Sequence, residues 1–199
     1  MAKAKNQKSK KTELGQIAAS ALTPAEMPQD GRAEVAFMGR SNAGKSSLIN
    51  VLIGAKVARI RGTPGRTQRI NFFAMSRWYM VDLPGFGYAR VSKSARASFG
   101  QAVEDYVTTR QELIAGVLIQ DCRRDPEEDE LMVMDWADSR NILLLIVASK
   151  MDRLNRQEQD ERKKALQSRY RRPVFLVSNR TGEGIGPLRE AIRGLGLSI

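Results

Sequence analysis

Apolar and polar positions along the chain follow two alternating patterns. Short, nearly continuous apolar runs are typical of buried strands, and apolar residues at every third or fourth position are typical of helices that cover a sheet. The runs predict strands near residues 34–39, 70–75, 77–82, 114–120, 142–148 and 173–177. The spaced segments predict helices near residues 45–53, 93–110, 129–139, 156–170 and 185–194.

The order of these elements predicts the fold class. Strands that alternate with helices form a mostly parallel sheet with helices on both faces, because each parallel connection has to cross over the sheet. The strands at 70–75 and 77–82 are joined too closely for a crossover helix, so they should form an antiparallel hairpin. We therefore expect an α/β fold in three α/β/α layers, with a mostly parallel six-stranded sheet that contains one antiparallel strand.

The connection between the first predicted strand and the first predicted helix carries a phosphate-binding motif. Residues 39–46 read GRSNAGKS, which is GxxxxGKS in the strand–loop–helix context that a P-loop requires. Backbone amides and the helix N-terminus would cradle phosphates, Lys45 would neutralise the β and γ charges, and Ser46 would ligate Mg²⁺. The alternative is a chance glycine-rich turn, which the filled motif and its flanks disfavour. The residues expected at the phosphates are Gly39, Arg40, Ser41, Asn42, Ala43, Gly44, Lys45, Ser46 and Ser47.

A second motif follows the predicted strand at 77–82. Asp82, Leu83, Pro84 and Gly85 form DxxG, a common turn by itself but a strong signal about forty residues after a P-loop. In P-loop GTPases this aspartate reaches Mg²⁺ through water, and the glycine amide senses the γ-phosphate. The order of the two motifs predicts the P-loop GTPase version of the three-layer fold.

The guanine base should be read after the strand at 142–148. Ser149, Lys150, Met151 and Asp152 are a variant of NKxD, in which the aspartate accepts hydrogen bonds from guanine and would be left unpaired by adenine. A serine stands where asparagine is usual, and its hydroxyl can make only some of the hydrogen bonds that an asparagine amide makes. In isolation SKMD would be taken for a solvated start of a helix. The loop expected to close over the base contains Val177, Ser178 and Asn179.

The γ-phosphate sensor should lie between the P-loop and DxxG. The turn-rich segment 62–68 offers two threonines, Thr63 and Thr67, whose hydroxyls suit Mg²⁺. We favour Thr67 because it lies closer to the strand that follows. The expected metal ligands are thus Ser46 and Thr67 directly and Asp82 through water. The contacts predicted for this segment are Gly65, Arg66, Thr67, Gln68 and Arg69.

The catalytic groups of a fast GTPase are missing from the sequence. Phe86 follows DxxG where Ras-like enzymes carry the glutamine that orients water, and the chain contains no histidine. Hydrolysis should therefore be slow unless a partner, a backbone carbonyl or a cation supplies the missing group. Lys45 and Thr67 remain the candidates for stabilising the reacting phosphate.

Several stretches together resemble one family. GRSNAGKSS, TPGRTQ, INFF and VDLPGFGYA are similar to the EngB/YsxC/YihA family of bacterial ribosome-biogenesis GTP-binding proteins, within the Era-like GTPases; the resemblance runs from about residue 30 to the end. It implies GTP or GDP with Mg²⁺, and a ribosomal subunit or precursor and its RNA as partner, in large-subunit assembly.

The resemblance also implies K⁺ activation held by Asn42, whose alternative role is to stabilise the turn of the loop. The chain departs from the family's usual TKAD at 149–152 and from its Asp-x-Arg-His at Asp121–Arg124, and the segment between 152 and 174 is short. Together these departures indicate a divergent member.

Charge and composition fit an RNA partner. The chain has 33 Lys and Arg against 22 Asp and Glu, a net charge of +11, and five lysines lie within residues 1–12. We expect residues 1–29 to be a basic, disordered extension and 30–199 to be the GTP-binding domain. Beyond the extension, basic residues gather at 90–96 (Arg90, Lys93 and Arg96) and at 162–172. A solvated cationic surface is the alternative to a polyanion partner, and aromatic residues do not alternate with the basic ones in the way that stacks single-stranded bases.

Other partners and compartments are disfavoured. No apolar segment approaches the length of a membrane span or signal peptide, and the single Cys122 builds no disulfide framework, so we expect a cytoplasmic protein. We also expect it to be monomeric when free and not to bind DNA. Two other functions stay open: a nucleotide-gated RNA-binding module with negligible turnover, and a P-loop ATPase or kinase, which Asp152 disfavours.

Overall fold

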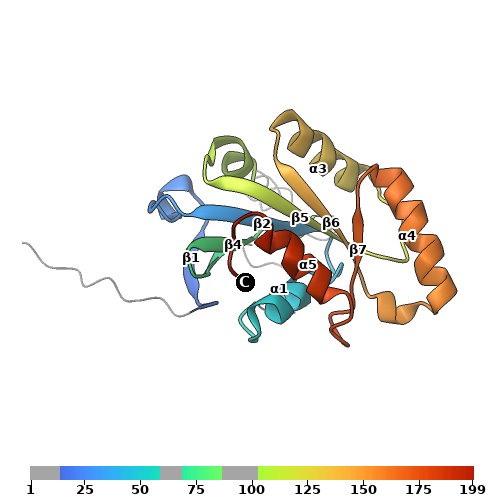
Figure 1. The fold of residues 1–199 in the computed structure, drawn as a ribbon. Coiled ribbons are helices and arrows are strands. Elements are labelled where there is room, and N and C mark those ends of the chain that lie inside the picture. The colour runs from blue at the N-terminus through green and yellow to red at the C-terminus, as the bar shows by residue number, and fades with distance from the viewer. Residues whose placement is uncertain (1–13, 59–68, 87–102) are drawn as a thin grey trace, which may run out of the picture.

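A seven-stranded sheet forms the centre of the molecule, with helices on both faces (Figure 1). The structure is a computed structural model that describes residues 14–58, 69–86 and 103–199. The strands are β1 Ile17–Ala21, β2 Ala33–Gly39, β3 Ile70–Ala74, β4 Trp78–Asp82, β5 Leu113–Asp121, β6 Leu143–Ser149 and β7 Val174–Leu176. The helices are α1 Lys45–Ile53, α3 Glu128–Ser139, α4 Arg156–Tyr170 and α5 Ile185–Arg193, with short 3₁₀ turns η1 Pro24–Glu26 and η2 Met151–Arg153.

The sheet has the order β1-β3-β4-β2-β5-β6-β7. β4, β2, β5, β6 and β7 run parallel to one another, whereas β3 pairs antiparallel with both β1 and β4. The predicted hairpin is the β3–β4 pair, in which Asn71 lies opposite Asp82. The mostly parallel sheet with one antiparallel strand is therefore confirmed.

The predicted strand count was wrong by one. Ile17–Ala21 forms β1 at the edge of the sheet, where Ala21 pairs with Ile70. This strand lies within the 1–29 segment that we expected to be disordered, so residues 17–21 are corrected to an ordered edge strand. Residues 1–13, with the five lysines, lie outside the described residues, as does the part of the predicted 93–110 helix before residue 103.

Each face of the sheet buries its own apolar cluster. On one face Leu48 of α1 and Leu188 of α5 are fully buried against β2, β4 and β5. On the other face Ala137 of α3, Leu166 of α4 and Tyr106, from the helical residues 103–109, pack against the same sheet. This arrangement confirms the three-layer architecture.

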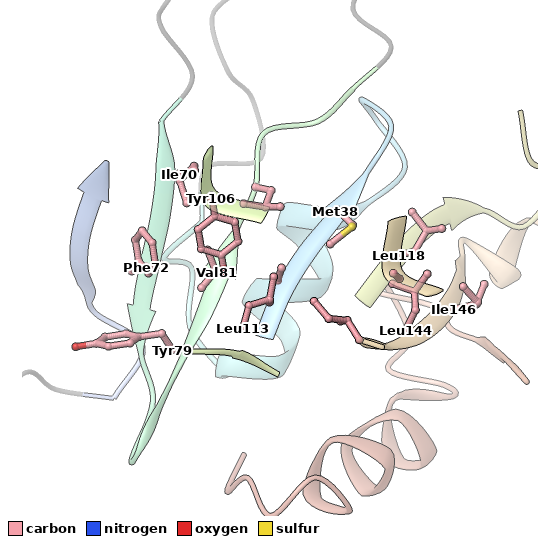
Figure 2. Packing of buried hydrophobic residues seen from close by; sticks show 14 of the residues in the cluster. Met38, Ile70, Phe72, Tyr79, Val81, Tyr106, Leu113, Leu118, Leu144 and Ile146 are labelled. Carbon is pink, nitrogen blue, oxygen red and sulfur yellow. The ribbon is translucent and has the colours of Figure 1, made fainter. Parts of the chain in front are cut away.

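Aromatic contacts fix the second of these faces near the hairpin. Figure 2 shows Phe72 of β3 between Tyr79 of β4 and Tyr106, and its ring meets theirs edge-on with centroids 6.1 and 6.0 Å apart. Edge-to-face pairs at this separation are favourable beyond the area that they bury. Tyr106 therefore anchors residues 103–109 to the hairpin that carries Asp82.

The parallel strands end together along one edge of the sheet. Strand pairing places Asp82 beside Phe37 of β2, and Asp121 beside Ser149. In open α/β sheets ligands bind at the carboxyl ends of the strands, where loops rather than side chains of the sheet line the surface. All sequence motifs that lie in the described residues follow these strand ends.

Candidate nucleotide-binding site

The P-loop joins β2 to α1, and its end is shaped by Gly44. This residue is the N-cap of α1 and has a φ of 101°, a left-handed conformation that side chains rarely adopt. Because Gly44 has no side chain to cap the helix, the amides of the first turn, which includes Ser46 and Ser47, keep no side-chain acceptor from that position. A helix start of this kind attracts an anion.

Lys45 and Asp82 face each other beside the P-loop. The Lys45 ammonium forms an ion pair and hydrogen bond with Asp82 Oδ1, and both side chains are nearly buried. Lys45 comes from the first turn of α1, and Asp82 from the end of β4. The structure thus brings together the cation predicted to neutralise phosphate and the carboxylate predicted to reach Mg²⁺ through water.

The chain after DxxG is joined to the P-loop through its backbone. The Ser41 amide donates to the Phe86 carbonyl at 3.0 Å, and the Phe86 amide donates to the Gly39 carbonyl at 3.3 Å. A Cβ on Gly85 would lie 3.2 Å from the Gly39 oxygen and 3.3 Å from the Ser41 nitrogen, so the close approach favours glycine. Leu83 is buried in the core, and the partly buried ring of Phe86 packs against this core.

Three side chains from the opposite side of the site bind three consecutive P-loop carbonyls. Lys150 Nζ donates to the Asn42 carbonyl at 2.6 Å. The Ser149 hydroxyl lies in hydrogen-bonding contact with the Ala43 carbonyl and 3.0 Å from the Gln120 carbonyl. Asn179 Nδ2 donates to the Gly44 carbonyl at 3.0 Å. The loops predicted to bind phosphate and base therefore form one connected site.

Asp152 is held as an ionised acceptor at the far end of this site. Its Oδ1 accepts from Ser178 Oγ at 2.8 Å, and its Oδ2 accepts from Arg180 Nε at 3.0 Å. The hydrogen bond from Ser178, followed by that from Arg180, lowers the pKa of Asp152 below its usual value. The carboxylate is then fully charged at neutral pH, as an acceptor for the donors of guanine has to be.

The loops around Asp152 contribute mainly backbone. Met151 is buried, and its amide donates to the Val177 carbonyl at 3.1 Å, while the Val177 amide donates to the Ala148 carbonyl at 2.9 Å. These bonds fix the segment after β7 against the segment after β6. Ser178 and Asn179 are thereby placed beside Asp152 and Gly44 respectively.

Two groups near the site were missed as functional candidates. Asp121, at the end of β5, accepts from Lys150 Nζ at 3.1 Å and from Arg123 Nε at 2.9 Å. Burial by itself would raise the pKa of Asp121, but the hydrogen bonds from Arg123 and Lys150 outweigh it and hold that pKa well below its usual range. The signal in the sequence was an acid at the end of the strand that neighbours the SKMD strand.

The second missed group is an ion pair of the P-loop. The Arg40 guanidinium forms a hydrogen-bonded ion pair with Glu127, the N-cap of α3, and lies 3.8 Å from Glu130. Arg40 was expected among the phosphate contacts because of its position in GRSNAGKS. Its side chain is instead directed to the acidic start of α3, so only its backbone remains a candidate for that role.

The sensor segment is only partly described. Gly65, Arg66, Thr67 and Gln68, together with Thr63, lie outside the described residues, so the choice between the threonines stays a prediction. Arg69 is described, and its guanidinium donates to the Ser20 carbonyl at 3.0 Å and to Glu26 at 2.7 Å. That engagement at the sheet edge does not support the predicted contact of Arg69 with the nucleotide.

The described residues fit a magnesium-bound guanine nucleotide. At one end of the site lie the start of α1, which attracts anions, and the nearly buried side chains of Lys45 and Asp82. The ionised carboxylate of Asp152 lies at the other end. Within residues 14–58, 69–86 and 103–199, no group of three or more His, Cys, Asp or Glu side chains is placed to hold a metal, and no helix is long and apolar enough to cross a membrane.

Comparisons with known proteins agree with this geometry. A family described as 50S ribosome-binding GTPase matches residues 34–180. A probable GTP-binding protein EngB from Clostridium kluyveri is 45% identical over 141 residues, which cover 70% of this chain and 72% of that protein. The EngB protein of Thermotoga maritima is 42% identical over 180 residues, 88% and 92% of the two chains.

A crystal structure of a probable GTP-binding protein engB has the same fold. It superimposes with a TM-score of 0.68 over 81% of this chain and 97% of that one, at 23% sequence identity. At that identity the likeness speaks for the fold alone.

Proposed function

The chain belongs to the EngB family of GTP-binding proteins, and from this premise we propose that it is a GTP-dependent switch that acts in ribosome assembly, on the large subunit. The observation that carries the proposal is the set of three P-loop carbonyls bound by Lys150, Ser149 and Asn179. Because these side chains come from the predicted base-reading loops, one ligand with both a base and phosphates would contact both halves of the site.

Each end of the site has its own task in nucleotide binding. Lys45 and the amides at the start of α1 would neutralise and hold the phosphates, and Ser46, Thr67 and Asp82 would hold Mg²⁺, which supplies further positive charge there. Asp152 would accept from the two guanine donors. A site that buries such an acceptor rejects a base without those donors, which favours GTP and GDP over adenine nucleotides.

Hydrolysis is proposed to be slow without help. Phe86, in the position after DxxG, packs against the core, and its side chain has no polar atom to orient water. The missing group would come from K⁺ beside Asn42, from a backbone carbonyl, or from a ribosomal partner. Asn42 has a φ of 65°, and its carbonyl is bound by Lys150, so its backbone is held in a defined conformation in the loop.

The partner surface is proposed from charge. In the described part of the chain, α4 and the residues after it carry exposed cations at Lys163, Lys164, Arg169 and Arg171, whereas Arg162 and Arg172 pair with Asp125 and Asp138. Exposed cations of this kind bind the phosphate backbone of RNA, with an affinity that falls as salt is added. The cluster of Arg90, Lys93 and Arg96 lies outside the described residues and is the second proposed contact.

A second function is favoured by the same Phe86 packing: an RNA- or ribosome-binding module gated by the nucleotide, with negligible turnover. Multiple-turnover phosphate release separates the two. We expect GTP hydrolysis that rises when K⁺ replaces Na⁺ at equal ionic strength, and rises again with large ribosomal subunits. Release that stays at the level of a protein-free blank under all these conditions would favour the module without turnover.

A further inference from the structure

The side chain of Asn179, in the loop after β7, takes no part in the hydrogen bonds that close this loop. The loop is closed by the Ser178 amide, which donates to the Glu183 carbonyl at 2.9 Å, and by the Gly182 amide, which donates to the Ser178 carbonyl at 2.9 Å. Ser178 Oγ also accepts from the Thr181 amide at 3.1 Å. Asn179 takes no side-chain part in these bonds, and its amide group reaches 135 residues back along the chain to Gly44.

Asn179 and Ser149 converge on the same glycine. A Cβ placed on Gly44 would lie 3.1 Å from Asn179 Nδ2 and 3.2 Å from Ser149 Oγ. The Ser149 hydroxyl has one proton, and the carbonyls of Ala43 and Gln120 are both within its reach. It therefore has no donor left for Gly44, and the amide of Asn179 supplies that bond.

The Gly44 carbonyl links this contact to the phosphate end of the site. It accepts the first helical hydrogen bond of α1, from the Leu48 amide at 2.9 Å, as well as the bond from Asn179. The second bond fixes the orientation of the peptide that precedes Lys45. Asn179 Oδ1 is itself buried and has no partner among the described residues, so a donor from a bound molecule or water would complete the group.

We propose that Asn179 is a positioning residue for the nucleotide, and that it shares with Ser149 a clamp on the P-loop, in which Ser149 binds the Ala43 carbonyl and Asn179 the Gly44 carbonyl. This inference rests on the proposed nucleotide site. The division of labour follows from the number of protons: the one hydroxyl proton of Ser149 cannot serve the Gly44 carbonyl as well, and the amide of Asn179 in the neighbouring loop binds it instead.

The test is the dissociation rate of a fluorescent GDP analogue, with thermal unfolding of the nucleotide-free protein as a second readout. Asn179→Ala should speed release by about 5- to 10-fold, the effect of losing one hydrogen bond in a closed site. Asn179→Asp, which keeps the shape but places a carboxylate against the Gly44 carbonyl, should speed it at least as much. Gln157→Ala is the control, because it removes an exposed amide on α4 that bonds only Glu161 among the described residues.

The unfolding temperature separates positioning from a merely structural role. Because the Leu48 bond and the loop's own hydrogen bonds remain in Asn179→Ala, that temperature should match the Gln157→Ala control. Faster GDP release at an unchanged unfolding temperature supports the proposal. If Asn179→Ala keeps the wild-type unfolding temperature and also releases GDP at the wild-type rate, the proposal is overturned. Failure of the wild type to hold GDP at all would overturn the proposed function instead.

A swap of the two residues tests the sharing directly. Ser149 is fully buried, so Ser149→Asn alone should crowd Asn179 and speed release. Asn179→Ser alone should also speed it, through loss of the Gly44 bond. The double variant moves the amide to position 149 and relieves the crowding, so it should release GDP more slowly than either single variant. Effects that simply multiply would show that the two positions do not share the clamp.

Discussion

The contact between Asp121 and Lys150 provides the sharpest prediction for nucleotide affinity. Lys150 Nζ is bound from two sides, by the Asn42 carbonyl at 2.6 Å and by Asp121 Oδ2 at 3.1 Å. Asp121 is nearly buried, so its charge is little screened, and it holds the ammonium above the P-loop. Asp121→Asn keeps the size of the side chain and removes the charge. We expect Lys150 to lose its fixed position and the affinity for GDP to fall.

The size of the loss follows from the geometry. Two unit charges 3.1 Å apart attract by about 5 kcal/mol at an effective dielectric constant of about 20. Lys150 is 32% exposed, so solvent screening and the cost of desolvating the pair remove most of that attraction. We expect a net loss of about 1–2 kcal/mol, towards the lower end of the range of about 1.5–3 kcal/mol for a hydrogen bond to a charged group. This corresponds to about 5- to 30-fold weaker GDP binding.

Two matched variants decide whether the pair with Lys150 causes the loss. Titration calorimetry with GDP should show the full loss for Asp121→Asn and little change for Asp125→Asn, which breaks an exposed pair with Arg162. Arg123→Ala also removes a partner of Asp121 but leaves Lys150 in place, so its loss should be clearly smaller. Equal losses for Arg123→Ala and Asp121→Asn would refute the reasoning, because the effect would then come from the loop after β5.

Four further predictions test other parts of the site. Asp152→Asn should weaken GDP and favour xanthosine diphosphate in competition binding; GDP and ADP bound equally well by the wild type would contradict the role of Asp152. Thr67→Ala should lower the preference for a GTP analogue over GDP while sparing GDP itself, and the same result from Thr63→Ala instead would reverse our choice. Asn42→Ala should abolish the K⁺-over-Na⁺ difference in hydrolysis rate, and a difference that persists would place the cation elsewhere. The pKa of Asp121 and that of Asp152 are both lowered in the fold. The ionised carboxylates therefore stabilise the fold fully above the unfolded pKa of about 3.9, and this stabilisation is lost as the pH falls below that value. In urea unfolding from pH 5 to 2, the free energy of unfolding should fall less for Asp121→Asn than for the wild type.

Most of the fold could be predicted because its strands are buried and its helices are amphipathic. β5 and β6, for example, are continuous apolar runs, and the predicted helices at 45–53 and 156–170 match α1 and α4 residue for residue. β1 could not be found in this way. Its sequence IAASA contains mostly small residues, and only Ala21 is fully buried, so it has no hydrophobic period. It becomes a strand only because the exposed edge of β3 offers it a pairing partner.

The site was predicted as a set of motifs, and what could not be predicted is how they touch. The order of GKS, DxxG and SKMD shows which residues gather at the strand ends, because parallel strands end at one edge. That Arg40 turns to Glu127, or that Asn179 reaches Gly44, depends on side-chain directions that no local pattern contains. The convergence of Ser149 and Asn179 on one glycine is a property of the folded chain alone.

Co-sedimentation with purified large ribosomal subunits, in the presence of a non-hydrolysable GTP analogue or GDP, tests the central claim most directly. A GTP-dependent switch binds its partner through contacts that differ between the two nucleotide states. We predict that the protein pellets with the subunits in the presence of the analogue and pellets less in the presence of GDP. With either nucleotide it should be released from the subunits as salt is raised. Equal pelleting with the analogue and with GDP, at every salt concentration, would contradict the account.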